Sequence, residues 1–262
     1  MARSSAAEVV LATVTARPVG IAGLDALGLA LARRLTDHGL RVIGWDRAPV
    51  RRRALAGLGP LAEDAPGTAD LGFGCDVVLS TLAAPELFTA ALGDPDRAGF
   101  APEMAPGSLI VDMGLAMPSD AQRLAALLGR GGIGLVDAPA LGDPALAATG
   151  GLAIHAAGFG EFVERLLPLL QLFGRVQPAG TVGRGHALAA VITFARRAEA
   201  DAAREALRVG LACGLAPELM PTIVAAASAG PPDDDPRLAI ARRMAAEALD
   251  GAAPVRTATL RR

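Results

Sequence analysis

Lysine, asparagine and tyrosine do not occur in this sequence of 262 residues, so all 25 of its basic residues are arginines. The chain therefore has no lysine amine and no tyrosine hydroxyl that could act as a catalytic acid or base. We attribute these absences to a nucleotide-composition bias in the genome rather than to selection on function. Aromatic residues make up 3%, and alanine, leucine, valine and glycine supply most of the apolar content. This composition is typical of helices that pack closely through small side chains.

Cysteine and long apolar runs are also scarce. Cys75 and Cys213 lie far apart and form no CxxC or metal-binding spacing, which predicts a cytoplasmic protein without a metal site. No apolar run reaches the length of a membrane span, so we expect no membrane association. The net charge is −2 and the arginines are dispersed, which argues against a nucleic-acid partner. A hydrophobic fraction of 52% nevertheless predicts a folded chain with a substantial core.

Short apolar runs alternate with amphipathic segments over residues 17–180, which predicts an α/β domain of the Rossmann type with a doubly wound, mostly parallel sheet. A helix is predicted from Ala26 to His38, ended by Gly39, and another from Ser119 to Leu128 after Pro118. The predicted strands are Val19–Ala22, Leu40–Trp45, Asp76–Leu82, Ser108–Asp112, Gly134–Asp137 and Leu152–Ala156. Residues 1–16 form a leader, which is either an extra edge strand or disordered.

Residues 181–262 have a different pattern and predict a smaller all-α domain. One long helix is expected from about Gly185 to Cys213, because apolar residues recur there at helical spacing without an interrupting proline. Shorter helices are expected near 217–228 and 236–249, separated by the Gly-Pro-Pro-Asp segment at 230–233. The sequence thus predicts a domain built on one long helix.

The segment Gly23-Leu24-Asp25-Ala26-Leu27-Gly28 follows the first strand and opens the first helix, as the dinucleotide-binding fingerprint G-x-G-x-x-G does. Asp46 follows the second strand, where an acidic residue binds the adenosine ribose, and it slightly favours NAD over NADP. Arg47 either covers the adenine, reaches a 2′-phosphate or is solvated. Asp25, however, replaces the second glycine. A carboxylate ~4 Å from a phosphate charge costs about 4 kcal/mol at an effective dielectric near 20, so we expect weakened or lost binding.

Several segments in the same order resemble the β-hydroxyacid dehydrogenases, the family of 3-hydroxyisobutyrate and 6-phosphogluconate dehydrogenases to which imine reductases are related. The resemblance runs from about Pro18 to Leu249, and the chain ends earlier than the family pattern. The segments that carry it are Gly20–Leu31, Asp76–Leu82, Pro106–Pro118, Asp137-Ala138-Pro139, Gly150-Gly151-Leu152 and Gly180–Gly185. It implies a cofactor site formed by Gly23, Leu24, Asp25, Ala26, Leu27, Gly28, Asp46, Arg47, Leu82 and Ala83. It also implies a homodimer through the C-terminal helical domain.

The same resemblance implies hydride transfer from a small hydroxy acid, with a lysine and an asparagine on the long helix and serine-containing loops around the substrate. The lysine falls on Ala189 and the asparagine on Thr193 in this chain. The loop positions expected to meet the substrate are Gly114, Leu115, Leu141 and Gly142. Loss of one general acid or base costs ~10²–10⁴ in rate. The ordinary hydroxy-acid reaction is therefore not expected.

His186 is the one candidate for a replacement acid or base, since it lies at the start of the long helix. A helix N-terminus should lower its pKa, and a capping or surface role is the competing interpretation. Two functions remain open. One is a divergent family member that has lost the activity and acts as a binding or subunit-contact module for a partner that the sequence does not identify. The other is an active NAD(P)-dependent reductase for an apolar or iminium-like substrate.

Overall fold

A computed structural model describes residues 15–114, 116–219 and 222 of the chain. The chain packs as two units, which divide after Ala190, later than the boundary after residue 180 predicted from the sequence. The predicted leader lies outside the described residues except for Thr15 and Ala16. The helix predicted at 236–249 also lies outside them. Of the one predicted at 217–228, the structure shows a short 3-10 helix, η3 (Pro217–Leu219).

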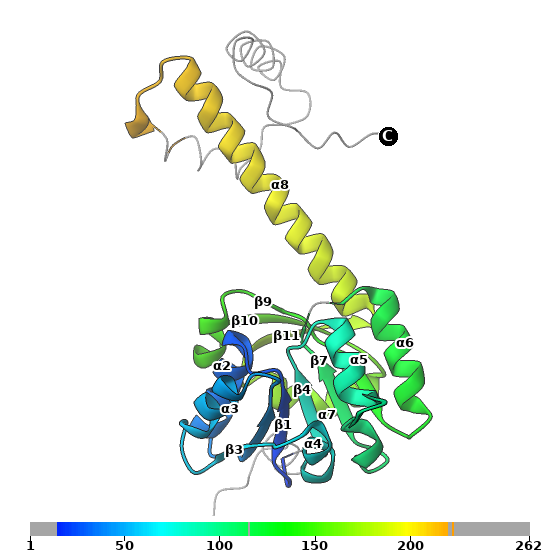
Figure 1. The fold of residues 1–262 in the computed structure, drawn as a ribbon. Helices are drawn as coiled ribbons and strands as arrows, with labels where there is room; N and C mark the ends of the chain where they lie inside the picture. Colours follow the sequence, from blue (N-terminus) through cyan, green and yellow to red (C-terminus); the bar gives the residue numbers. More distant parts are fainter. Residues whose placement is uncertain (1–14, 115, 220–221, 223–262) are drawn as a thin grey trace, which may run out of the picture. The chain divides into compact units, whose positions relative to one another are not determined.

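One sheet runs through the first unit in the order β11-β10-β8-β7-β4-β1-β2-β3 (Figure 1). Its strands are β1 (Val19–Ala22), β2 (Val42–Trp45), β3 (Ala62–Asp64), β4 (Val77–Ser80), β7 (Leu109–Asp112), β8 (Gly134–Asp137), β10 (Leu152–Ala157) and β11 (Gly174–Gly180). All neighbours are parallel except β8 and β10, which meet antiparallel, and β9 (Ala140–Leu141), which pairs antiparallel with β10. The predicted Rossmann-type parallel sheet is confirmed.

Helices cover both faces of this sheet. The helices are α2 (Ala26–Asp37), α3 (Pro49–Ala56), α4 (Thr68–Gly74), α5 (Ala84–Leu92), α6 (Pro118–Gly129) and α7 (Gly160–Leu170). Buried residues of α2, α3 and α7 join one apolar cluster, and those of α4, α5 and α6 join another. Two separate cores on opposite faces are what a doubly wound sheet requires.

The remaining elements are short or belong to both units. A two-stranded hairpin, β5 (Gly93–Asp94) with β6 (Arg97–Ala98), and the 3-10 helix η1 (Ala101–Glu103) connect α5 to β7, and a second 3-10 helix, η2 (Pro144–Thr149), precedes β10. The long helix α8 (Arg184–Ala212) starts in the first unit and continues in the second, close to its predicted bounds.

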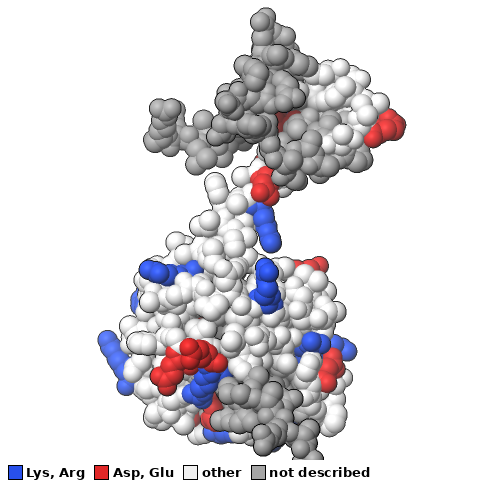
Figure 2. All heavy atoms as spheres, turned by 180° about the vertical axis from the view of Figure 1, so that it is seen from behind, with Lys and Arg blue, Asp and Glu red and all other residues white. Residues whose placement is uncertain are grey.

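No described helix is long and apolar enough to cross a membrane. On the face drawn in Figure 2, basic and acidic side chains are interspersed and form no continuous basic surface.

Candidate dinucleotide site

The glycine turn follows β1, the strand at which the strand order of the sheet reverses. β1 pairs with β2 on one side and with β4 on the other, so the carboxyl ends of β1 and β4 border the crevice in which such sheets bind ligands. Gly23 has a φ of +95°, and a side chain there would bring its Cβ within 2.6 Å of the Thr81 hydroxyl. Its N–H donates to the Trp45 carbonyl at 2.8 Å. Glycine is therefore required at this position by both conformation and space.

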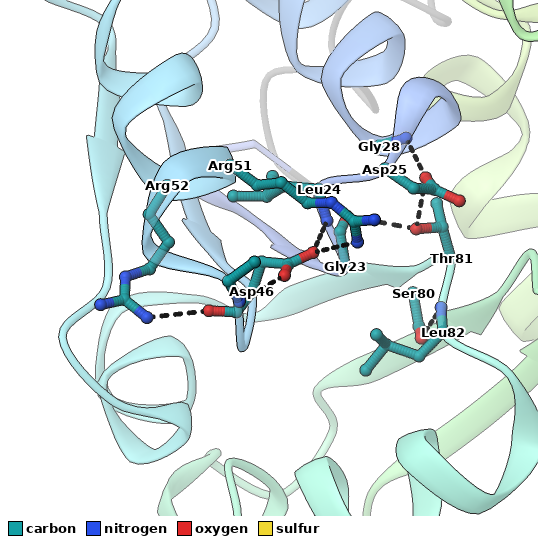
Figure 3. A network of polar contacts seen from close by, with 11 residues as sticks. Gly23, Leu24, Asp25, Gly28, Asp46, Arg51, Arg52, Ser80, Thr81 and Leu82 are labelled. Atoms are coloured by element: carbon teal, nitrogen blue, oxygen red, sulfur yellow. Dashed lines mark hydrogen bonds and ion pairs between the residues drawn. The ribbon is translucent and has the colours of Figure 1, made fainter.

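Asp25 caps helix α2 from within the turn (Figure 3). Its Oδ1 accepts from the Gly28 N–H at 2.9 Å and from the Thr81 hydroxyl at 3.0 Å. The carboxylate thus occupies one of the free N–H groups with which a helix N-terminus binds phosphate. Ala26 and Leu27 keep first-turn N–H groups that no described residue accepts. The site can hold a phosphate on these two donors, but only beside a resident negative charge.

Asp46 is buried and has more backbone partners than the sequence indicates. Its Oδ2 accepts from the Leu24 N–H at 2.8 Å and from Arg51 at 3.2 Å, and its Oδ1 accepts from the Ala48 N–H at 2.8 Å (Figure 3). The side chain therefore ties the end of β2 to the glycine turn and to the start of α3. Most of its hydrogen-bonding capacity is used before any ribose arrives.

A pocket of about 450 Å³ opens beside this turn, and we call it the adenosine-side pocket. Of the residues predicted to bind the cofactor, Asp46, Arg47 and Leu82 line this pocket, whereas Ala83 is exposed and caps α5. Sequence reasoning missed its other lining residues, which are Trp45, Ala48, Arg51, Thr68, Pro85, Glu86, Thr89, Ala90, Asp94 and Arg97. Most of these follow β2 or belong to α5, which follows β4. Since β2 and β4 both pair with β1, the expected strand order could have placed these residues beside the turn. Arg97 on the β5–β6 hairpin carried no such signal.

Backbone packing and backbone conformation restrict which side chains fit at the loop positions that the resemblance assigns to the substrate. A Cβ on Gly114 would lie 2.0 Å from the Leu82 carbonyl oxygen, so the loop after β7 lies directly against the loop after β4. Leu141 is half-buried on β9, and Gly142 follows it with a φ of +132°. Leu115 lies outside the described residues. A serine could not simply be restored at position 114, because the clash is with backbone rather than with a flexible side chain.

His186 is buried, and its predicted capping or surface role is wrong. Its Nε2 lies 3.1 Å from Asp112 Oδ2, and its backbone N–H donates to Asp137 Oδ2 at 3.0 Å. Burial lowers the pKa of His186, but the hydrogen bond and charge of Asp112 and the charge of Asp137 outweigh it and raise the pKa overall. The predicted lowering by the helix N-terminus is therefore wrong, since Asp112 hydrogen-bonds to the ring and Asp137 adds a second negative charge.

Asp137 completes this cluster at the ends of β7 and β8. It has no exposed surface, and its Oδ1 accepts from the Gly183 N–H at 2.8 Å. Burial raises the pKa of Asp137 despite the backbone hydrogen bonds that lower it. The cluster attaches the start of α8 to the sheet. Ala189, at the position of the family lysine, is buried nearby on α8, whereas Thr193 is exposed in the second unit.

Comparison with known proteins identifies the family of this domain. The profile of the NAD binding domain of 6-phosphogluconate dehydrogenase matches residues 18–184. The chain belongs to this family. L-threonate dehydrogenase of Cupriavidus necator is 30% identical over 212 residues, which are 79% of this chain and 69% of that protein. 2-(Hydroxymethyl)glutarate dehydrogenase of Eubacterium barkeri is 27% identical over 211 residues, covering 80% and 69%. The resemblance to β-hydroxyacid dehydrogenases is confirmed, and with it an NAD(P)-binding domain.

Solved structures agree on the fold. The 3-hydroxyisobutyrate dehydrogenase of Mycobacterium tuberculosis superposes with a TM-score of 0.69 at 23% identity, covering 77% of this chain and 67% of that one. A variant imine reductase from Myxococcus stipitatus, solved with NAD⁺, gives a TM-score of 0.73 at 20% identity, covering 81% and 72%. At these identities the likeness speaks for the fold alone. Among the described residues no group of three His, Cys, Asp or Glu side chains could hold a metal ion.

Proposed function

We propose that this β-hydroxyacid dehydrogenase-like protein binds a nicotinamide dinucleotide with reduced affinity and does not dehydrogenate hydroxy acids. Cofactor binding is supported by the turn at the switch point of the sheet and by the 450 Å³ pocket beside it. Reduced affinity is supported by Asp25, whose carboxylate already accepts from the Gly28 N–H. The pyrophosphate would have to approach a like charge there.

The backbone contact at Gly114 carries the second half of the proposal. A loop that binds a substrate carboxylate needs hydroxyl or N–H donors aimed at it. Here the Gly114 N–H donates to Asp112 Oδ1 at 3.1 Å, and its Cα faces the Leu82 carbonyl too closely for any side chain. His186 is buried with its Nε2 against Asp112, so this nitrogen is already engaged within the chain. The absence of a polar side chain at position 114 thus follows from the loop packing.

Cofactor titration and turnover assays test the two halves separately. NADH and NADPH are titrated while nucleotide fluorescence and the melting temperature are followed. Hydride transfer is then assayed with 3-hydroxyisobutyrate, L-serine, L-threonate and 2-(hydroxymethyl)glutarate, the substrates named for relatives. Saturable binding without turnover is the expected result. Turnover of any of these acids would refute the loss of activity, and no response at several millimolar would refute cofactor binding.

A reductase acting on an apolar or iminium-like substrate is the alternative. It is favoured by the turn, in which the strand, the glycines Gly23 and Gly28 and the helix stand in the order that a dinucleotide site requires. Such a reaction needs positioning against the nicotinamide more than it needs a carboxylate-binding loop. Oxidation of NADPH in the presence of cyclic imines would establish it, and the binding-module proposal would then be replaced.

A homodimer through the second unit is part of the proposed role as a subunit-contact module. Val191 and Phe194 are 64% and 63% exposed on α8, and Leu211 follows at 52% on the same helix. Three exposed apolar side chains on one described helix support the proposal of a contact surface there. Sedimentation of the full chain should give a dimer at micromolar concentration, and a monomer there would exclude it.

A further inference from the structure

The start of α8 is held on the sheet by a buried cluster of charged side chains. Asp137 accepts from the Gly183 N–H at 2.8 Å and from the His186 backbone N–H at 3.0 Å. The His186 ring returns to the sheet, where its Nε2 lies 3.1 Å from Asp112 Oδ2. We call Asp112, Asp137 and His186 the α8 latch. Each of the three is at most 4% exposed, so their charges interact with little screening by water.

Asp112 extends the α8 latch to the loop after β7. Its Oδ1 accepts from the Gly114 N–H at 3.1 Å, while its Oδ2 contacts His186. Gly114 in turn lies against the loop after β4, since a Cβ on it would be 2.0 Å from the Leu82 carbonyl oxygen. One carboxylate therefore ties the start of α8 and a loop beside the candidate site to the same histidine.

Glycine contacts leave no space between the start of α8 and the sheet. A Cβ on Gly185 would lie 2.5 Å from the His155 carbonyl oxygen and 2.8 Å from Asp137 Oδ2. A Cβ on Gly183 would lie 2.9 Å from the Pro118 carbonyl oxygen at the start of α6. Space too small for a Cβ is also too small for a water molecule. Water can therefore reach Asp137 from this side only if the start of α8 moves away.

Histidine is the side chain whose charge ordinarily changes near neutral pH, so His186 is the proton-dependent member of the latch. The charged or titratable groups of the described elements packed here are Asp112 on β7, Asp137 on β8, His155 on β10 and Arg184 on α8 itself. Helix α6 adds Pro118 and Gln122, which do not ionise. Burial lowers the pKa of His186, but the two carboxylates outweigh it and raise the pKa.

We propose that the α8 latch is proton-dependent, so that protonated His186 keeps the start of α8 and the Gly114 N–H closed on the sheet and loss of the proton makes local opening more frequent. Without that proton, two buried carboxylates are left with neutral hydrogen-bond donors alone. Their repulsion and their lost hydration favour a state in which water enters. Such local opening does not require global unfolding.

Amide hydrogen exchange of the full chain, followed residue by residue by NMR, tests the latch. Exchange rates are measured from about pH 6 to about pH 9 and divided by the intrinsic rate at each pH, and the His186 ring is titrated in the same samples. The Gly114, Gly183 and His186 N–H groups should lose protection together. The loss should be about tenfold for each unit by which the measured pKa of His186 exceeds 6.5.

The Leu24 N–H is the internal control for this measurement. It donates to buried Asp46 at 2.8 Å, but the charged partner of Asp46 is Arg51, which keeps its proton over the whole range. Its protection should therefore stay constant. An equal loss at Leu24, or no loss at the three latch amides, would overturn the proposal.

His186→Gln keeps a side-chain donor for Asp112 but removes the titration, so the protection of the Gly114 and Gly183 N–H groups should become independent of pH. His38→Gln is the matched control, because His38 lies exposed at the end of α2, and it should keep the wild-type profile. A pH dependence that survives in His186→Gln would assign the opening to another group and overturn the latch.

Asp137→Asn is a second variant that removes one of the two carboxylate charges. It should lower the pKa of the His186 ring and reduce the pH-dependent loss of protection at the Gly114 N–H. A folded Asp137→Asn protein with an unchanged ring pKa would refute the role of this carboxylate in holding the proton. The wild-type comparison with Leu24 decides the proposal even if neither variant folds.

Discussion

Replacing Asp25 with serine would test whether the negative charge in the glycine turn limits cofactor affinity. A serine hydroxyl can still accept from the Gly28 N–H, and serine is as good an N-cap as aspartate. The Thr81 hydroxyl keeps its second acceptor, the Gly23 carbonyl, at 3.2 Å. The substitution therefore removes the charge while the geometry of the turn is retained.

The size of the effect follows from Coulomb's law and from exposure. A carboxylate ~4 Å from one phosphate charge interacts by about 1 kcal/mol in water and by about 4 kcal/mol at an effective dielectric near 20. Asp25 is exposed, so the lower part of this range applies. We expect Asp25→Ser to bind NADH and NADPH about 5- to 30-fold more tightly, and the gain should shrink as salt is added.

Calorimetric titration at two salt concentrations measures this gain. Asp143→Ser is the matched control, because Asp143 caps η2 through the Ala145 N–H at 2.8 Å in the same manner as Asp25 caps α2. The control should leave nucleotide affinity unchanged. Unchanged or weaker binding by Asp25→Ser in a folded protein would refute the idea that this charge opposes the cofactor. A gain that does not depend on salt would refute its electrostatic origin.

Three further variants address the rest of the domain. Gly114→Ser should lower the melting temperature and restore no hydroxy-acid dehydrogenation, because its Cβ would lie 2.0 Å from a backbone oxygen. Arg34→Met should lower the free energy of unfolding by about 1–3 kcal/mol in denaturant titrations, since its Nε donates to the Leu172 carbonyl at 2.8 Å. The raised pKa values of His186 and Asp137 mean that the folded state holds their protons more tightly. The contribution of His186 to the free energy of unfolding is complete below pH 6.5 and is lost as the pH rises through the pKa of the folded state. In denaturant titrations at a series of pH values, His186→Gln should therefore lose less stability than the wild type as the pH rises.

The sheet could be predicted from sequence wherever its strands are continuously apolar. Those strands are buried on both faces, so they appear as short apolar runs. β3 and β11 were missed because they lie at the two edges of the sheet. β3 carries exposed Glu63 and Asp64, and β11 contains glycines and Pro178, which only an edge strand tolerates.

The candidate site was predictable in its backbone and not in its side-chain contacts. The order of strand, glycine and helix located the turn, and the family resemblance located Leu82 beside it. The partner of Asp25 could not be predicted, because Thr81 is brought to it only by the pairing of β1 with β4. The burial of His186 was missed for the same reason, since Asp112 lies 74 positions away in the sequence.

Four carboxylates along the carboxyl edge of the sheet are bound in the same way, at the turn, in the loops and at the start of α8. Asp25, Asp46, Asp112 and Asp137 each accept hydrogen bonds from backbone N–H groups of this chain. Backbone donors at such an edge are the groups that usually bind phosphates and substrate carboxylates. Because the chain supplies its own anions to several of these donors, an incoming anion is left with the Ala26 and Leu27 N–H groups of the turn and with side-chain cations. Arg47, Arg51 and Arg97 line the adenosine-side pocket, so we expect a cofactor that binds here to be held more by its adenosine end than by its pyrophosphate.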